Sequence, residues 1–78
     1  PNPATEGVTV ALQCQEAFKG ELRLTDLSGR DLQRQTADAG GRGAQKWYVP
    51  TKGLAPGMYY LHLESNGATL FVRTIIKQ

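Results

Sequence analysis

Apolar and polar residues alternate along most of the chain, which is the two-residue period of a β-strand with one buried face. The first such run covers residues 7–14 and carries small or apolar side chains at every second position. The residues predicted to share its buried face are Val8, Val10, Leu12 and Cys14. No segment shows a convincing helical period, so the chain is expected to be built from strands.

A second run over residues 21–25 predicts another strand with alternating faces. Leu22 and Leu24 are expected to face inward, and Glu21, Arg23 and Thr25 outward. The run ends at residues 26–29, where Gly29 is expected to supply the positive φ of a tight turn. The polar residues 30–35 are then predicted to return as a strand at the edge of a sheet.

The middle of the chain is rich in glycine and proline, which mark its loops. Residues 38–43 have three glycines within four positions, and they predict the most flexible stretch of the molecule. A strand over residues 45–49 is expected to stop at Pro50, which has no backbone N–H to donate. The Pro56-Gly57 pair within residues 54–57 predicts a type II turn.

The last third of the chain predicts a β-hairpin. Residues 58–65 form its first strand, with Tyr59, Leu61 and Leu63 on one face. Asn66-Gly67 is the strongest hairpin signal in the sequence and leads into a terminal strand over residues 70–78. Its inward set is either Leu70, Val72 and Ile76 or Phe71 and Ile75, and alternation leaves both open because both sets are apolar.

The predicted fold class is all-β: an antiparallel, immunoglobulin-like β-sandwich of six to seven short strands, with a small barrel as the alternative. The 78 residues are expected to form a single domain, 1–78, with a small core, since a globule of this size hides only about 60% of its unfolded surface. Residues 1–5 are expected to be an extended connector from an upstream domain. The apolar terminal strand must be docked on the domain, because unpaired chain ends fray.

The composition narrows the classes of function. A chain with 40% apolar and 21% charged residues is typical of a folded domain and not of a disordered tail. Its net charge of +2 is scattered, which argues against nucleic-acid binding, and no run is long enough to span a membrane. A single cysteine excludes an internal disulfide framework. The sequence has neither an initiating Met nor a signal peptide, so we expect a C-terminal module of a longer parent protein.

Four blocks of sequence, in order along the whole chain, resemble a known family. They are Pro1-Asn2-Pro3-Ala4, residues 24–30, residues 54–63 and the basic, apolar end. In this order and spacing they resemble the type A C-terminal sorting domain of the type IX secretion system, also called the Por secretion system, of Bacteroidetes. One departure is Gln78, which stands where the family commonly has a basic residue and so weakens any requirement for a terminal charge.

The resemblance implies a folded secretion signal and not an enzyme, with no cofactor and no metal. It implies that the type IX translocon and the attachment (sortase-like) complex are the partners, and that they direct the parent protein across the outer membrane. The parent would pass through the periplasm and end at the cell surface, in the outer membrane or secreted. Anionic lipopolysaccharide would be a further partner, through the parent protein.

The resemblance also assigns roles to residues. Translocon recognition falls on the chain end, at Arg73, Ile75, Ile76, Lys77 and Gln78. The motif positions expected to act through the fold are Pro3, Asp26, Gly29, Arg30, Gly57 and Tyr59. Two alternatives stay open: Lys77 as a solvated charge that discourages edge-to-edge aggregation, and Tyr59 as a core aromatic with its hydroxyl bonded at the rim.

Competing functions would rest on the single Cys14, the single His62 and the aromatic residues. Cys14 and His62 are not expected to act as nucleophile and base, because alternation points them to different sides of their sheets. One Cys and one His do not complete a metal site either. A glycan-binding module would use Trp47, Tyr48, Tyr60 and Phe71, provided that these side chains line up on one flat surface.

Overall fold

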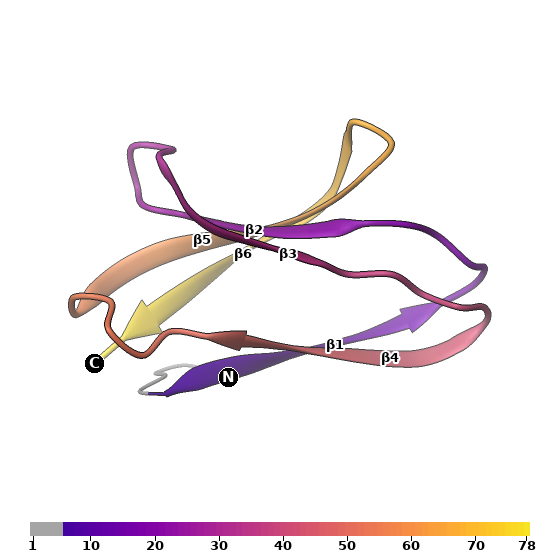
Figure 1. Cartoon of the computed structure of the whole chain (residues 1–78), viewed down its shortest axis with the longest axis horizontal. Coiled ribbons are helices and arrows are strands. Elements are labelled where there is room, and N and C mark those ends of the chain that lie inside the picture. The colour runs from indigo at the N-terminus through magenta and orange to yellow at the C-terminus, as the bar shows by residue number, and fades with distance from the viewer. Residues whose placement is uncertain (1–5) are drawn as a thin grey trace.

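The computed structural model describes residues 6–78, which contain six strands and no helix. The strands are β1 (Gly7–Cys14), β2 (Glu21–Thr25), β3 (Asp31–Thr36), β4 (Gly43–Pro50), β5 (Gly57–Ser65) and β6 (Ala68–Lys77). They form two antiparallel sheets, one with the order β1-β4 and one with the order β3-β2-β5-β6, stacked as two layers (Figure 1). The predicted all-β antiparallel sandwich is confirmed. The expected connector over residues 1–5 lies outside the described residues.

The core lies between the two sheets and follows the predicted alternation. On β1, Val8, Val10 and Cys14 are buried as predicted, while Leu12 is half-buried and packs against the core. The four-stranded sheet contributes Leu22, Leu24, Tyr59, Leu61, Leu63 and Ile75, and β4 contributes Val49. In β5 every second residue is buried, because that strand is central in its sheet and turns one face to the other layer.

The inward set of β6, which the sequence left open, is the odd-numbered one. Ile75 pairs with Tyr59 and is 1% exposed, and Phe71 pairs with Leu63 and is half-buried. The even-numbered residues face the other way, and Val72 is 51% exposed. We call the side of the four-stranded sheet that is turned away from β1 and β4 its outer face.

The two hairpin turns of the four-stranded sheet are those that the sequence predicts. Asn66 and Gly67 have φ values of 54° and 77°, the two positive values that a type I′ turn requires. Gly29 has φ 92°, and its N–H donates to the carbonyl of Asp26 at 3.1 Å. The type I′ turn sets the first pairs of the hairpin, Ser65 with Ala68 and Glu64 with Thr69. The register then shifts by one residue at Leu70, so that Leu63 pairs with Phe71.

The predicted type II turn at residues 54–57 is wrong in position. The hydrogen-bonded turn lies three residues earlier, where the N–H of Leu54 donates to the carbonyl of Thr51 at 3.1 Å. Gly53 supplies the positive φ there, at 92°. Gly57 opens β5 with φ 151°, far from the value near +80° of a type II turn.

Two further expectations need correction. Thr25 is fully buried and not exposed, because a register irregularity between β2 and β3 falls beside it and its hydroxyl lies 3.0 Å from His62 Nε2. The stretch over residues 38–43 is not free of packing, because Ala39 is buried and forms an antiparallel bridge with Phe18. The strand after it begins at Gly43 and includes Pro50, which makes it longer than predicted at both ends.

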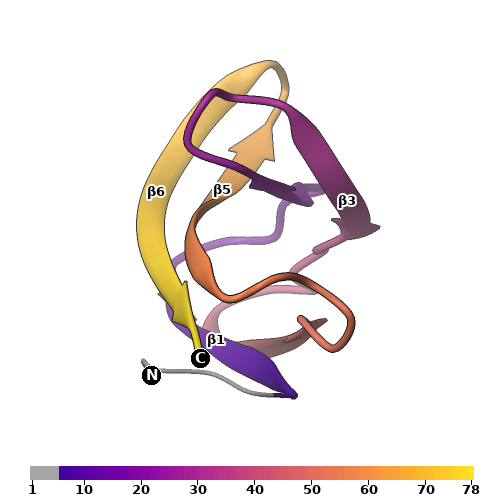
Figure 2. The same cartoon turned by 90° about the vertical axis from the view of Figure 1, so that its left-hand side faces the viewer.

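The two margins of the four-stranded sheet differ. β3 forms one margin, as predicted for this polar strand, and β6 forms the other (Figure 2). Two β3 side chains reach across to the other layer: Gln33 Nε2 donates to the Pro50 carbonyl at 2.6 Å, and Gln35 Nε2 donates to the Tyr48 carbonyl at 3.0 Å. These bonds close the sandwich along β3 and β4, since they satisfy carbonyls of an edge strand.

Candidate functional site

Exposed apolar side chains gather on the outer face beside and along β6. They are Met58 at 48%, Val72 at 51% and Ile76 at 43% exposure, and we call them the β6 strip. Leu70 is exposed as well, but it lies at the register shift between β5 and β6 and has no partner on β5. Met58 is the cross-strand partner of Ile76, so the two side chains lie on the same face. A row of large apolar residues on an edge strand is unusual, because such edges are commonly protected by charges.

Arg73 lies at the rim of this margin. It pairs with the buried Leu61, so it starts on the inner side of the sheet, but its position on an edge strand leaves it exposed. Its guanidinium carbon lies 5.2 Å from the centre of the Phe71 ring, within the range of a cation–π contact. No carboxylate of residues 6–78 lies within ion-pair distance of Arg73. Its charge is therefore available to a partner.

The five residues expected to contact the translocon fall into two groups. Arg73, Ile76 and Gln78 are exposed. Ile75 is 1% exposed and belongs to the core, and Lys77 is 9% exposed. A molecule that binds the folded domain can therefore contact the first group directly. The second group can affect binding only by holding β6 in position.

Lys77 is held in a joint between the two sheets. Its Nζ donates to the carbonyl of Thr51 at 2.6 Å, in a buried hydrogen bond. The N–H groups of Thr51 and Lys52 donate in turn to the carbonyl of Glu6, at 2.9 and 3.2 Å. The side chain thus connects the end of β6 to the loop after β4 and to the start of β1. The alternative that Lys77 is a solvated charge is wrong.

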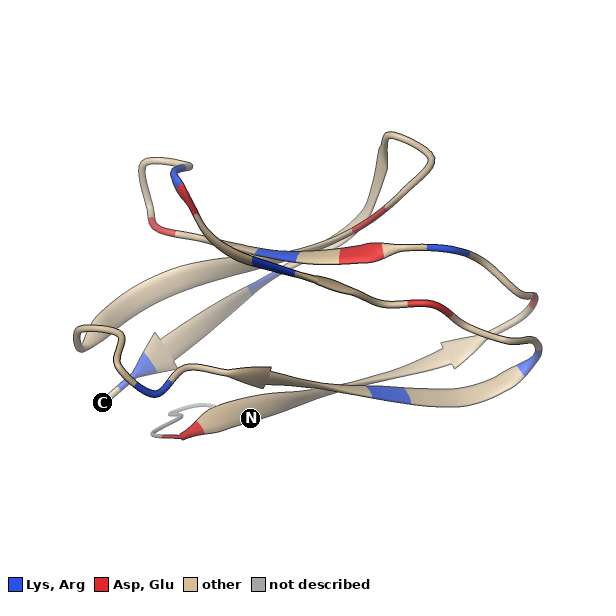
Figure 3. Cartoon of the chain, viewed as in Figure 1, with Lys and Arg blue, Asp and Glu red and all other residues tan. Residues whose placement is uncertain are grey.

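The rest of the outer face carries an ion-pair network over β3, β2 and β5. Arg23 bonds both Asp31 at 2.8 Å and Glu64 at 2.9 Å, and Arg34 bonds both Asp31 at 2.5 Å and Glu21 at 2.7 Å. Acidic and basic positions lie side by side on β2 and β3, whereas the charged positions of β6 are all basic (Figure 3). The outer face is therefore divided into a charged part and an apolar part.

The network favours the charged form of four of its five members, which are Arg23, Arg34, Asp31 and Glu64. A hydrogen bond from Arg23 is the main cause that lowers the pKa of Glu64, and hydrogen bonds from Arg23 and then Arg34 lower the pKa of Asp31. The same bonds raise the pKa of both guanidinium groups, so all four side chains stay ionised at neutral pH. Each positive charge has two negative neighbours, which leaves this part of the face with little attraction for a charged partner.

The motif positions lie in turns and at the start of β5. Asp26 Oδ1 accepts hydrogen bonds from the hydroxyl and N–H of Ser28 and from the N–H of Arg30, and these bonds lower the pKa of Asp26. The Arg30 guanidinium lies 3.2 Å from the same carboxylate. Tyr59 is buried, and its hydroxyl donates to the Ala55 carbonyl. Pro3 lies outside the described residues.

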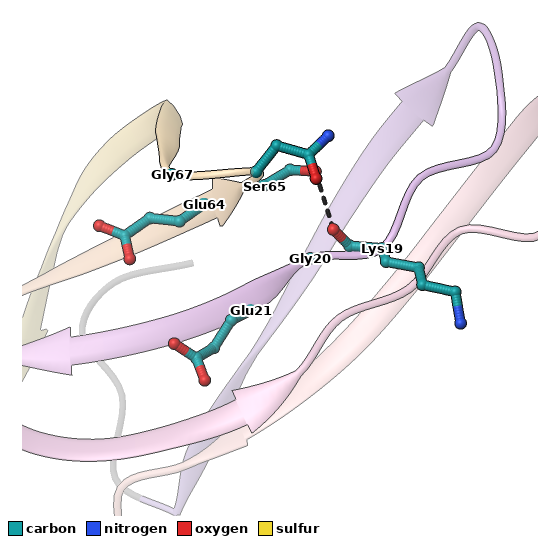
Figure 4. Close-up of a pocket in the computed structure, with 7 residues that line it drawn as sticks. Lys19, Gly20, Glu21, Glu64, Ser65 and Gly67 are labelled. Atoms are coloured by element: carbon teal, nitrogen blue, oxygen red, sulfur yellow. Dashed lines mark hydrogen bonds between the residues drawn. The ribbon is translucent and has the colours of Figure 1, made fainter.

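Two shallow pockets lie at the end of the sandwich opposite Lys77. The first, of about 280 Å³, is lined by Lys19, Gly20, Glu21, Glu64, Ser65, Asn66 and Gly67 (Figure 4). Its two carboxylates are already bonded to Arg34 and Arg23, and Ser65 Oγ donates to the Lys19 carbonyl at 2.7 Å. The second is lined by the segments 17–19 and 38–40. Both carboxylates and the Ser65 hydroxyl of the first pocket are thus used within the fold.

The residues of the competing functions do not form one site. Cys14 is buried and donates weakly to the Leu12 carbonyl, while His62 bonds Thr25 in the other sheet. Trp47 packs against Phe18 and the core. The remaining aromatic residues proposed for a glycan surface are divided between the sheets: Tyr48 on β4, Tyr60 on β5 and Phe71 on β6. Within residues 6–78, no three His, Cys, Asp or Glu residues gather as a metal-binding group.

Together, the fold and the terminal strand define a small β-sandwich domain whose last strand is part of the core on one face and exposes apolar residues on the other. The chain matches, over residues 1–78, the family described as the secretion system C-terminal sorting domain. It belongs to this family of type IX secretion signals, and the predicted function as a sorting signal is confirmed. Searches of the curated proteins and of the solved structures return no match.

Membership of the family defines the general function of the chain. A type IX sorting signal interacts with the type IX secretion machinery and brings its protein to the cell surface or into the medium. The family is known as a secretion-sorting signal and not for catalysis, and nothing in the comparisons supports glycan binding. Among the described residues, no helix is long and apolar enough to cross a membrane.

Sequence reasoning missed most of the β6 strip. Met58 and Val72 were not among the expected contact residues, although the pattern of the sequence indicates an exposed apolar set. Both faces of the terminal strand are apolar in the sequence, and a strand at a margin of a sandwich can bury only one of them. One apolar set had therefore to be left exposed, whichever way the strand faced.

Proposed function

We propose that the type IX machinery recognises this domain in its folded state, through the exposed side of β6. Arg73, Ile76 and Gln78 are the direct contacts among the predicted residues, and Ile75 and Lys77 act by holding the strand in place. The observation that carries the proposal is the division of exposure at the end of the chain, where Ile75 and Lys77 are buried while Ile76 and Gln78 are exposed.

A folded recognition domain suits a secretion signal, because it can be attached to exported proteins of any size. The strip exists only when β6 is paired with β5 and packed on the core, so the signal is complete only when the domain has folded. The proposed route takes the parent protein through the periplasm to the translocon and then to the attachment (sortase-like) complex. Anionic lipopolysaccharide would meet the parent protein and not this domain, which is proposed to act without catalysis, metal or cofactor.

The test is to fuse the chain to an exported reporter in a type IX-competent host and to measure the reporter on intact cells with an antibody. Deletion of the last five residues is expected to leave the reporter in the periplasm. Because that deletion also removes Ile75 and Lys77, it does not separate a lost contact from a lost fold.

Point variants separate the two causes. Arg73→Ala, Ile76→Ala and Gln78→Ala are expected to lower surface display while the purified domain still melts cooperatively. Tyr48→Ala and Lys46→Ala change exposed residues of β4, on the other sheet, and are expected to display normally. Normal display by all three variants on β6 and at the chain end would overturn the proposed recognition surface.

A further inference from the structure

We infer that the free edge of β1 pairs with β1 of a second copy of the chain, so that two domains share one continuous antiparallel sheet. The inference goes beyond the proposed function and uses a different strand. It rests on the backbone of β1, whose one strand partner among residues 6–78 is β4.

The backbone groups of β1 divide between the two sides of the strand. The Glu6 carbonyl accepts a hydrogen bond from the N–H of Thr51, so the even-numbered residues of this segment turn their N–H and C=O groups toward β4. The groups of the odd-numbered residues turn to the opposite edge, because backbone groups alternate along a strand. Among residues 6–78, no strand pairs with that edge. Its residues are Gly7, Thr9, Ala11 and Gln13.

The other edge of the same sheet is closed. There the carbonyls of Tyr48 and Pro50 accept hydrogen bonds from side chains of β3. β1 lacks the usual protections of an edge strand, since Gly7–Cys14 contains no charged residue and no proline, and its pairing with β4 runs without a register shift. An edge of this kind is a template on which another strand can pair.

The two faces of β1 indicate which strand fits there. A strand added beside β1 places alternate side chains on the core side, next to the half-buried Leu12, and the others on the outside, next to the exposed Thr9 and Ala11. An occupant with apolar residues on the first face and uncharged residues on the second would extend both faces of the sheet. β1 itself has this alternation, so a second copy supplies it without bringing like charges together.

Two-fold symmetry gives a register that uses the whole edge. With the axis at Val10, Thr9 of each copy lies opposite Ala11 of the other, and Gly7 lies opposite Gln13. All four edge residues of both copies then exchange backbone hydrogen bonds. A contact of one strand with one strand is smaller than a standard interface, so we expect a weak dimer with a dissociation constant of about 1–100 μM.

The first test measures the mass of the full chain by sedimentation equilibrium, from about 1 μM to about 1 mM, where we expect reversible dimers. Thr9→Glu combined with Ala11→Glu puts carboxylates directly opposite each other in both symmetric pairs and should weaken the dimer by at least about tenfold. Ala44→Glu is the matched control, because Ala44 is exposed on the same face of this sheet but lies on β4. It should dimerise like the parent.

A second test reads the register and does not depend on charge. In chains that also carry Cys14→Ala, the Thr9→Cys variant is mixed with the Ala11→Cys variant and oxidised. These two positions lie opposite each other in the dimer, so the mixed disulfide should form faster than the disulfide of either variant with itself. Ala44→Cys is the control and should crosslink least. Cooperative melting of each variant checks that the fold is kept.

A chain that stays monomeric at about 1 mM would overturn the inference. So would a dimer that the double glutamate variant leaves unchanged, or one that crosslinks equally through Ala44→Cys, because such a dimer uses another surface. If the chain is monomeric but the double glutamate variant loses surface display, the edge binds the secretion machinery and not a second copy. Arg73→Ala, Ile76→Ala and Gln78→Ala should dimerise like the parent, so this inference and the recognition surface proposed above can fail separately.

Discussion

At the scale of single residues, Gly20 lies where its backbone comes very close to the backbone of Ala37 and of Glu64. A Cβ at this position would lie 2.8 Å from the Ala37 carbonyl oxygen and 3.0 Å from that of Glu64. Both are backbone atoms, which cannot move aside as the end of a flexible side chain can. The Gly20 N–H also donates to Asp38 Oδ1 at 3.1 Å, which holds this segment against the chain that follows β3.

We therefore expect Gly20→Ala to destabilise the domain by about 1–3 kcal/mol, the usual cost of forcing an extra methyl group into a packed site. Gly40→Ala is the matched control, because a Cβ there would meet nothing within 4 Å. Chemical denaturation of the two variants measures the difference. Equal stability of the two would show that the backbone around Gly20 relaxes freely.

Lys77 allows a second prediction at this scale. Lys77→Ala removes both the packing of a buried aliphatic stem and the hydrogen bond to the Thr51 carbonyl, and we expect a loss of about 1–2 kcal/mol. The exposed Lys52→Ala serves as the control and should change stability by less than about 0.5 kcal/mol. Native-state hydrogen exchange should show faster exchange at the end of β6 in the Lys77 variant alone. Unchanged protection there would mean that the joint does not hold the strand.

At the scale of elements, the ion-pair network ties three neighbouring strands together across the outer face. Arg23 on β2 bonds Asp31 on β3 and Glu64 on β5, so one guanidinium bridges both partners of its strand. A single exposed ion pair stabilises little, but a network shares the cost of fixing each side chain. The effect should be visible as a dependence of stability on pH.

The direction of that dependence follows from the lowered pKa values of Asp31 and Glu64. Their ordinary values are 3.8 and 4.5, so below neutral pH the unfolded state takes up protons before the folded state does. The stabilisation is complete above those ordinary values and is lost as the pH falls through the lower, folded values. We expect the melting temperature to be nearly constant from pH 7 to about 5 and to fall below that.

A carboxylate variant identifies the contribution of the network. Glu64→Gln should lower the melting temperature at neutral pH, and its difference from the parent should shrink in acid, where the parent loses the same bond. Glu16→Gln changes an exposed acid outside the network and should follow the parent curve at every pH. A Glu64 variant whose deficit persisted unchanged in acid would exclude the ionised pair as the cause.

The elements also show how far the sequence predicts this structure. β5 is predicted well because its alternation is clean and both of its neighbours are strands of the same sheet. The orientation of β6 is not predictable, since both faces are apolar and the choice depends on which of them meets the core. Thr25 and Lys77 are misjudged because a register irregularity and a long-range bond to Thr51 decide their burial, and neither is visible as a local pattern.

The candidate site is predictable to the same extent. The sequence predicts a recognition site at the end of the chain, but alternation alone cannot divide the residues there into exposed and buried sets. That division needs the pairing of Tyr59 with Ile75, which places Ile75 in the core and turns Ile76 to solvent. The β6 strip then follows, since it is the apolar set that the core does not use.

At the scale of the whole molecule, one strand serves both stability and recognition, and two adjacent residues separate these roles. Ile75→Ala removes a fully buried side chain from the core and is expected to cost about 2–4 kcal/mol, a large part of the stability of a domain this small. Ile76→Ala changes a side chain that is 43% exposed, and we expect a cost below about 1 kcal/mol.

The two variants should therefore fail in different ways when the reporter fusion is expressed. Ile76→Ala should fold normally and lose surface display at every temperature, because a contact of the recognition surface is missing. Ile75→Ala should keep its display at low growth temperature, where the domain still folds, and lose it as the temperature rises toward the melting point of the variant. Display and thermal unfolding, measured on both variants, check the prediction. If the display of Ile76→Ala also recovered on cooling, loss of fold would explain both defects, and Ile76 would not be a contact residue.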